Sequence, residues 1–189
     1  MELAEQLRAY RPFNEQEERD RDLILQFLEK EPNVFFRENR AAHMTASGWV
    51  VNAARTRVLM AYHNLYQSWS WLGGHADGDR DLLGTALREV REESGLKAVR
   101  CAAGGIFSVE VLCVDGHIKH GSYVSSHLHL NVTYLLEADE TEALAVKADE
   151  NSAVAWFTPE EAVRVSTEPW YQEHIYRKLN AKLAALGGA

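Results

Sequence analysis

Between residues 15 and 30, apolar and polar residues alternate with the period of an α-helix. The apolar positions that recur at helical spacing are Leu23, Ile24, Phe27 and Leu28. Asn14 followed by Glu17 resembles an N-capping arrangement, and Pro32 disfavours helical backbone in the residue before it. The pattern therefore predicts a first helix over about residues 15–30.

Further along the chain, short apolar runs bounded by turn residues predict strands. We expect these strands at residues 45–52, 58–63, 69–72, 106–114, 127–136 and 154–157. The run at 127–136 alternates most regularly, because leucine, valine and tyrosine occupy its even positions and histidine, asparagine and threonine most of its odd ones. Such alternation is typical of a strand with one apolar and one polar face.

Helical signals separate and follow these strands. A helix is expected over about residues 82–94, because Gly95 stands in the usual position just after a helix. Thr158 to Glu161 combine a capping box with proline at the first helical position, and residues 170–186 form an amphipathic tail. The order of helix, strands, helix, strands and helix indicates an α+β fold, in which helices cover the faces of a mixed β-sheet.

Composition narrows the class of protein. The 189 residues fit a single domain with extensions, and a hydrophobic content of 46% is that of a globular chain. There is no apolar run long enough to cross a bilayer, and the start lacks the basic and apolar regions of a secretory signal. Cys101 and Cys113 offer no disulfide framework, so we interpret them as small core residues of a cytoplasmic protein.

The formal net charge of −8 bears on the kind of partner. It disfavours a nucleic-acid backbone or an anionic membrane as the main partner, since both are themselves negative. A small phosphorylated ligand remains compatible with this charge, because a bound metal ion supplies positive charge locally. We therefore expect a small-molecule partner, with no nucleic acid and no membrane.

Three glutamates crowd one strip of the helix expected at residues 82–94. Glu89, Glu92 and Glu93 stand three and four positions apart, where like charges repel and raise one another's pKa. A hard divalent cation such as Mg²⁺ would neutralise them, because it prefers carboxylate oxygens. The alternative is a solvated acidic face balanced by Arg88 and Arg91.

The surrounding residues favour the cation. Residues 74–96 resemble the signature of Nudix hydrolases, G-x5-E-x7-R-E-U-x-E-E-x-G-U, in which U is a bulky aliphatic residue. Eight of the nine specified positions match in register: Gly74, Arg88, Glu89, Val90, Glu92, Glu93, Gly95 and Leu96. Arg80 stands where the signature has glutamate, between Asp79 and Asp81, and Leu72 stands where many relatives have proline.

The resemblance implies an α/β/α sandwich with a mixed β-sheet over residues 41–189, including the last helix, preceded by a helical extension over residues 1–40. It also implies a hydrolase of acid anhydrides, which uses Mg²⁺, or Mn²⁺ in its place, to cleave the diphosphate linkage of a nucleoside diphosphate joined to another group. The extension has no assigned role; dimerisation and a wall of the substrate cleft are both open.

The same resemblance assigns roles to residues of the signature. Glu89 and Glu93 are expected to bind the metal, Glu92 to contribute directly or through water, and the Gly74 carbonyl to join them. Arg88 is expected to hold a glutamate in position through a charge-assisted hydrogen bond.

Other candidate site residues lie outside the signature. The resemblance implies a general base on a loop before a late strand, so Glu150, in an acidic loop before the strand at 154–157, is the first candidate, and Glu110 is a weaker one. His75, His127 and His129 are candidates for substrate binding, because neutral histidine forms hydrogen-bonding walls. The alternative for His127 and His129 is a zinc site that they form with His117 or His120.

Two other functions remain open. A Nudix-fold sensor would bind a nucleotide without turning it over, and Arg80 and Leu72 motivate that alternative. A Nudix-fold isopentenyl-diphosphate isomerase would need a cysteine and a further acid at the substrate, and neither Cys101 nor Cys113 has such a setting. The intact glutamates favour hydrolysis.

Overall fold

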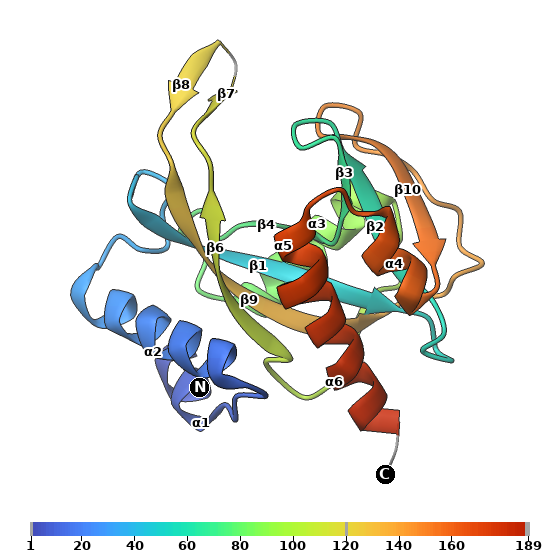
Figure 1. Cartoon of the computed structure of the whole chain (residues 1–189), viewed down its shortest axis with the longest axis horizontal. Coiled ribbons are helices and arrows are strands. Elements are labelled where there is room, and N and C mark those ends of the chain that lie inside the picture. The colour runs from blue at the N-terminus through green and yellow to red at the C-terminus, as the bar shows by residue number, and fades with distance from the viewer. Residues whose placement is uncertain (1, 120, 188–189) are drawn as a thin grey trace.

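A mixed, curled β-sheet forms the centre of the molecule, and helices flank it (Figure 1). The structure is a computed structural model, and it describes residues 2–119 and 121–187. The strands of the main sheet are β1 (Ala42–Val51), β2 (Val58–His63), β3 (Ser68–Ser70), β4 (Leu72–His75), β5 (Arg100–Cys101), β6 (Ser108–Val114), β9 (His127–Glu137) and β10 (Asn151–Phe157). A separate hairpin is formed by β7 (His117–Lys119) and β8 (Ser122–Val124), and it projects away from the main sheet (Figure 1).

The helices lie before, between and after these strands. They are α1 (Leu3–Ala9), α2 (Glu15–Lys30), α3 (Leu82–Ser94), α4 (Pro159–Val165), α5 (Pro169–Tyr171), the π-helical turn η1 (Gln172–Tyr176) and α6 (Arg177–Gly187). The capping predictions are confirmed, because the Asn14 side chain accepts a hydrogen bond from the Glu17 amide and Thr158 forms a capping box with Glu161. Among the described residues, no helix has the length and apolar character that crossing a membrane requires.

The sheet is built around one parallel pair of strands. β1 runs parallel to β9 along its whole length, and it runs antiparallel to β2 and β4. Every residue of β1 is buried, because the strand has a neighbour on each side and is covered on both faces. The expected mixed sheet is confirmed.

Two apolar cores lie on the two faces of this sheet. On one face, Leu82, Ala86 and Val90 of α3 pack with even-numbered side chains of β1 and β9. On the opposite face, odd-numbered residues such as Trp49 and Leu135 pack with α4, η1 and α6. The sheet therefore lies between helices, and the alternation along β9 divides its side chains between the two cores.

Some expectations from the sequence are wrong. The polar residues of β9 do share one face, as expected, but at Asn131 and Thr133 this face is buried and donates hydrogen bonds to the Glu110 carboxylate. Cys113 is exposed, so it is not a core residue, and Cys101 is half-buried. Helix α1 and the β7–β8 hairpin were not expected from the sequence, because each is too short to give a clear periodic pattern.

Candidate active site

Helix α3 presents the three glutamates because both of its ends are fixed. At its start, the Asp81 carboxylate accepts a hydrogen bond of 3.0 Å from the Gly84 amide. At its end, Gly95 adopts a left-handed φ of 75°, and its amide donates to the Arg91 carbonyl. A residue with a side chain would be strained at this φ, so glycine sets the point at which the helix stops.

Glu93 is the most enclosed of the glutamates. Its residue is 1% exposed, and its carboxylate accepts a hydrogen bond of 3.1 Å from the Gly73 amide of β4. Burial raises the pKa of Glu93 to about 8, and the nearby carboxylates of Glu89 and Glu150 contribute to the rise. At neutral pH the Glu93 carboxyl therefore keeps its proton unless a cation approaches it.

Glu89 lies against the backbone of β4 at Gly74. A Cβ atom at Gly74 would lie 2.7 Å from Glu89 Oε2, so only glycine leaves room for this carboxylate. Burial raises the pKa of Glu89; the Arg88 guanidinium, with Nη2 at 3.2 Å from Glu89 Oε1, opposes this effect, and Glu92 reinforces it. Arg88 Nε also lies 4.0 Å from Glu92 Oε1.

Glu150 reaches the same region from a distant part of the chain. Its loop is attached to α3 by Asn151, whose amide nitrogen donates to the Glu93 carbonyl at 3.3 Å. The Asn151 side-chain oxygen accepts a hydrogen bond of 3.0 Å from the Lys147 amide. The buried Asn151 side chain therefore connects the loop of residues 147–150 to the helix that carries the glutamates.

The Lys147 ammonium lies between the acidic side chains. Its Nζ atom is 3.0 Å from Glu150 Oε2 and 3.7 Å from Glu92 Oε2. It also lowers the pKa of Glu93 and of Glu89, although less than burial raises them. A positive charge therefore already occupies part of this acidic cluster, which we call the glutamate cluster: Glu89, Glu92, Glu93 and Glu150.

The residues of the glutamate cluster fit a hard divalent cation. Carboxylate oxygens and a backbone carbonyl are the ligands that Mg²⁺ prefers, and within the described part of the chain no ammonium or guanidinium directly contacts the buried Glu93 carboxyl. Arg88 and Lys147 hold Glu89, Glu92 and Glu150 in separate ion pairs rather than around one point. Cation binding would therefore have to displace the Lys147 ammonium from its contacts with Glu92 and Glu150.

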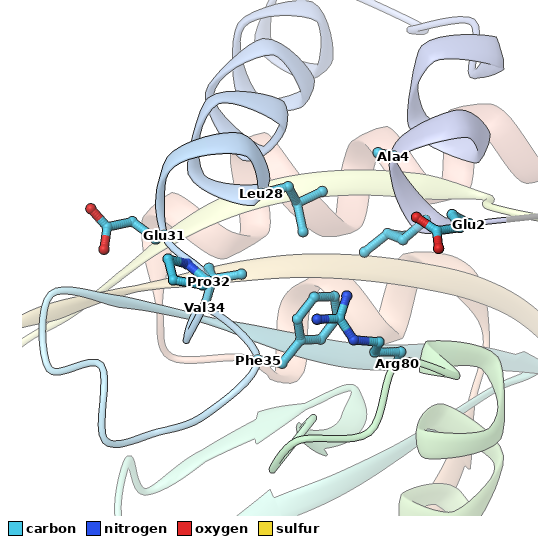
Figure 2. Close-up of a pocket in the computed structure, with 9 residues that line it drawn as sticks. Glu2, Ala4, Leu28, Glu31, Pro32, Val34, Phe35 and Arg80 are labelled. Carbon is cyan, nitrogen blue, oxygen red and sulfur yellow. The ribbon is translucent and has the colours of Figure 1, made fainter.

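Arg80, which departs from the signature, contacts the segment before β1. Its guanidinium lies over the Phe35 ring, 4.7 Å from the ring centroid (Figure 2). Both side chains line a cavity of about 360 Å³ whose other walls come from α1 and the end of α2 (Figure 2). The neighbouring Asp79 approaches Arg88, with 3.8 Å between Oδ2 and Nη1. Asp79, and not Arg80, therefore supplies the contact from this loop to Arg88.

The histidines lie on the other face of the sheet. His75 directly follows Gly74, so its side chain points away from α3. Its ring lies 5.0 Å from that of His129 and 5.1 Å from that of His43, between centroids, and His127 contacts the same group. The expected substrate-binding histidines therefore gather with one another and not with the glutamate cluster.

Sequence reasoning missed His43, which belongs to this group of histidines. The signal that could have found it is the pairing of β1 with β9, but strand register is not readable from one sequence. His117 lies 6.5 Å from His127 between ring centroids, and His120 falls outside the described residues.

Glu110, the weaker base candidate, is fully buried in β6. Its carboxylate accepts hydrogen bonds from Lys178 at 2.9 Å, from Asn131 at 3.0 Å and from Thr133 at 2.8 Å. The Ser108 hydroxyl oxygen also contacts it. Glu110 is therefore engaged in a buried ion pair, which does not suit a group that must meet an attacking water.

Comparisons with known proteins agree with this architecture. A family model described as NUDIX domain matches residues 42–179. A Caenorhabditis elegans Ap4A hydrolase in a binary complex has 16% sequence identity and a TM-score of 0.54, over 75% of this chain and 98% of that one. A NUDIX-family hydrolase from Clostridium perfringens has 18% identity and a TM-score of 0.53, over 76% and 97% of the two chains.

A third structure, the Escherichia coli dihydroneopterin triphosphate pyrophosphohydrolase, has 14% identity and a TM-score of 0.50, over 71% of this chain and 92% of that one. No curated protein sequence matches this chain. At such low identities the structural likenesses show the fold alone.

Proposed function

This chain belongs to the Nudix family, and on that premise we propose that it hydrolyses the diphosphate linkage of a nucleoside diphosphate joined to another group, with Mg²⁺ as its cofactor. The observation that carries the proposal is the glutamate cluster, in which α3 and the loop before β10 bring four carboxylates together. Hydrolysis of a diphosphate linkage is the function that four neighbouring carboxylates support best.

The residues that would hold the metal are Glu89, Glu93 and Glu92, together with the carbonyl of Gly74. Bound there, Mg²⁺, or Mn²⁺ in its place, would neutralise phosphate oxygens and lower the pKa of a water. Arg88 would keep Glu89 in place through the contact of 3.2 Å that the two side chains make. The Gly73 amide would hold the Glu93 carboxylate through its hydrogen bond of 3.1 Å.

Glu150 is the residue that we assign as general base. Its side chain is 46% exposed, so a water can reach it, and its loop is attached to α3 through Asn151. In the reaction, the Glu150 carboxylate would accept the proton of the water that attacks phosphorus. Glu92 and Glu93 would act with it by holding the cation that neutralises the charge of the reacting phosphate.

The substrate is proposed as a small molecule of nucleotide type. One compared structure is described as an Ap4A hydrolase and another as a dihydroneopterin triphosphate pyrophosphohydrolase, and both names indicate phosphorylated substrates. A substrate bound at the glutamate cluster would meet His75, His127 and His129 only across β4, because these side chains face away from α3.

The structure favours hydrolysis over the two rival functions. The sensor hypothesis rests on Arg80, but Arg80 stacks on Phe35 and Asp79 supplies the contact to Arg88. The isomerase hypothesis requires a cysteine at the substrate, but Cys113 is exposed and the Cys101 thiol donates to the Ala103 carbonyl.

The test is product release from a panel of phosphorylated compounds: ADP-ribose, a sugar nucleotide, a dinucleoside polyphosphate, a coenzyme A derivative and an oxidised nucleotide. Each is measured with Mg²⁺ and with chelator. Glu93→Gln and Glu150→Gln should each lower kcat by about 100-fold or more, whereas Glu160→Gln, on the exposed start of α4, should match the native protein. Binding by calorimetry without any cleavage would favour the sensor and contradict the proposal.

A further inference from the structure

Three histidines come together where β4, β1 and β9 lie side by side. The parallel register of β1 and β9 places His43 directly beside His129. The antiparallel register of β1 and β4 places His75 beside Thr45, one side-chain repeat along from His43. The three imidazoles therefore share the face of the sheet that points away from α3.

The three rings surround one point. The centroid distances are 5.1 Å from His43 to His75, 5.0 Å from His43 to His129, and 5.0 Å from His75 to His129. One ring nitrogen from each lies within 4.8 Å of the others. Zinc binds imidazole nitrogen at about 2.0–2.1 Å, so tetrahedral ligands lie roughly 3.3 Å apart. Small rotations of these side chains would therefore close the set around an ion.

His43 already holds the orientation that a metal ligand needs. Its residue is 4% exposed, and its Nδ1 donates a hydrogen bond of 3.0 Å to the Asn39 carbonyl. This bond fixes the tautomer, so the lone pair lies on Nε2. Nε2 is buried and has no hydrogen-bond partner among the residues that the structure describes. A buried polar atom left without a partner is costly, and a metal ion would supply the partner.

His127 supports His129 in a similar way. His127 Nδ1 donates to the Ser125 carbonyl at 2.8 Å, so Nε2 of the neutral ring is an acceptor. That Nε2 lies 3.2 Å from Nε2 of His129, which then donates its proton, and the lone pair of His129 lies on Nδ1. Metal-binding histidines usually donate their second N–H to a partner in this manner.

From these contacts we propose that His43, His75 and His129 form a binding site for a transition-metal dication, of which Zn²⁺ is the type. Imidazole nitrogen suits zinc rather than Mg²⁺, and three protein ligands leave a fourth position open to water or a ligand. The site lies on the opposite face of the sheet from the glutamate cluster, and it does not depend on the proposed hydrolysis.

The test uses the full chain without an affinity tag, because a histidine tag would itself bind zinc. The protein is dialysed against Zn²⁺ in excess Mg²⁺ and its metal content is measured; Co²⁺ is then added in place of Zn²⁺ to record visible absorption bands. We expect one metal ion per chain. His43→Asn and His75→Asn should each weaken binding at least about tenfold.

Two matched variants serve as controls. His174→Asn removes an exposed histidine of η1, and Glu93→Gln alters the glutamate cluster, so both should bind zinc as the native chain does. Thermal melts in chelator show whether each variant folds. His75 is less buried than His43, so His75→Asn tests the site with a second ligand variant whose substitution disturbs the core less.

The proposal would be overturned by a native chain that retains no Zn²⁺ and gives no Co²⁺ bands, or by a His43→Asn variant that binds as well as the native chain. It would also be overturned if inorganic phosphate, and not Zn²⁺, shifts the imidazole signals in NMR spectra. That result would identify the histidines as direct anion contacts.

Discussion

At the scale of single residues, the Lys147 ammonium lies among the carboxylates that a metal ion would bind. This ammonium contacts Glu150 and Glu92 and interacts electrostatically with Glu89 and Glu93, so it offsets part of their mutual repulsion. A divalent cation entering the glutamate cluster would meet this positive charge. Lys147 would therefore compete with a bound divalent cation for the same carboxylates.

We expect Lys147→Met to bind Mn²⁺ more tightly than the native chain, by roughly threefold to tenfold, since removing one like charge at short range is worth about 1 kcal/mol in a partly solvated site. Calorimetric titration with Mn²⁺ measures this change. Lys97→Met, on an exposed loop, is the control. Equal or weaker binding by Lys147→Met would show that the lysine assists the metal instead of opposing it.

Arg80 gives a second prediction at this scale. Because its guanidinium stacks on Phe35, Arg80→Glu should lower the free energy of unfolding by about 0.5–1 kcal/mol. Arg80→Lys keeps a cation over the Phe35 ring, so it should lower the free energy of unfolding by a smaller amount. Urea denaturation measures both variants. Arg80→Glu should not raise the rate of hydrolysis, because Asp79 already contacts Arg88. A clear gain in rate would contradict the assignment of Asp79 as the residue that supplies this contact.

At the scale of elements, a buried polar network joins α2, β6 and α6. Glu17 of α2 is fully buried, and its carboxylate accepts hydrogen bonds from Lys182 and from Ser108, each at 2.7 Å. Lys178 lies 3.5 Å from Glu17 and donates to Glu110 at 2.9 Å. These charges are paired and hydrogen-bonded, which is the condition for burying them at all.

The network predicts how stability depends on pH. Burial opposes ionisation of Glu17, but Lys178 and hydrogen bonds from Lys182, Tyr10 and the Phe13 amide outweigh it, so the pKa of Glu17 lies below its usual value. A lowered pKa stabilises the fold above the pKa of the unfolded chain, and this stability is lost as the pH falls below the ordinary glutamate range.

We therefore expect the melting temperature of the native chain to fall more steeply under acid than that of Glu17→Gln. At neutral pH, Glu17→Gln should cost about 3–5 kcal/mol, because it leaves buried lysines without their counter-charge. Melts across acidic and neutral pH measure both effects. The neighbouring Glu18→Gln, on the exposed side of α2, should behave as native, and equal acid slopes for all chains would refute the argument.

How well each element could be predicted depends on the range of its interactions. Helices α2 and α3 were predicted because their apolar period and their caps are local signals. Glu110 was an isolated charge in an apolar strand, and nothing local showed that Lys178 would meet it from α6. The carboxylates of α3 could be singled out as candidates because one helix holds them, whereas Glu150 could be singled out only through the family resemblance.

At the scale of the whole molecule, the helices before β1 are integrated with the rest of the fold. Leu3, Leu7 and Ile24 belong to the same apolar core as α3 and the central strands. Tyr10 donates to Glu17 at 2.6 Å and accepts from Lys182 at 2.7 Å. Residues 1–40 were expected to be an extension of the domain, and we now propose that they complete its core.

Removal of residues 1–31 tests that proposal. We expect the shortened chain to lose its cooperative thermal transition, because the cut exposes core residues of the sheet and leaves Lys178 and Lys182 without Glu17. Circular dichroism and calorimetry of the two chains give the comparison. A shortened chain that melts cooperatively near the native temperature would show that the helices are a separable addition.

The contact between Glu17 and Lys182 also constrains the order of events during synthesis. The two residues are 165 positions apart, so the carboxylate on α2 leaves the ribosome long before its partner on α6 exists. Until then, the Glu17 carboxylate has hydrogen-bond donors such as Tyr10 and the Phe13 amide but not the lysine, so docking of α2 is less favourable. The ion pair with Lys182 therefore adds its stabilisation only after translation has delivered α6.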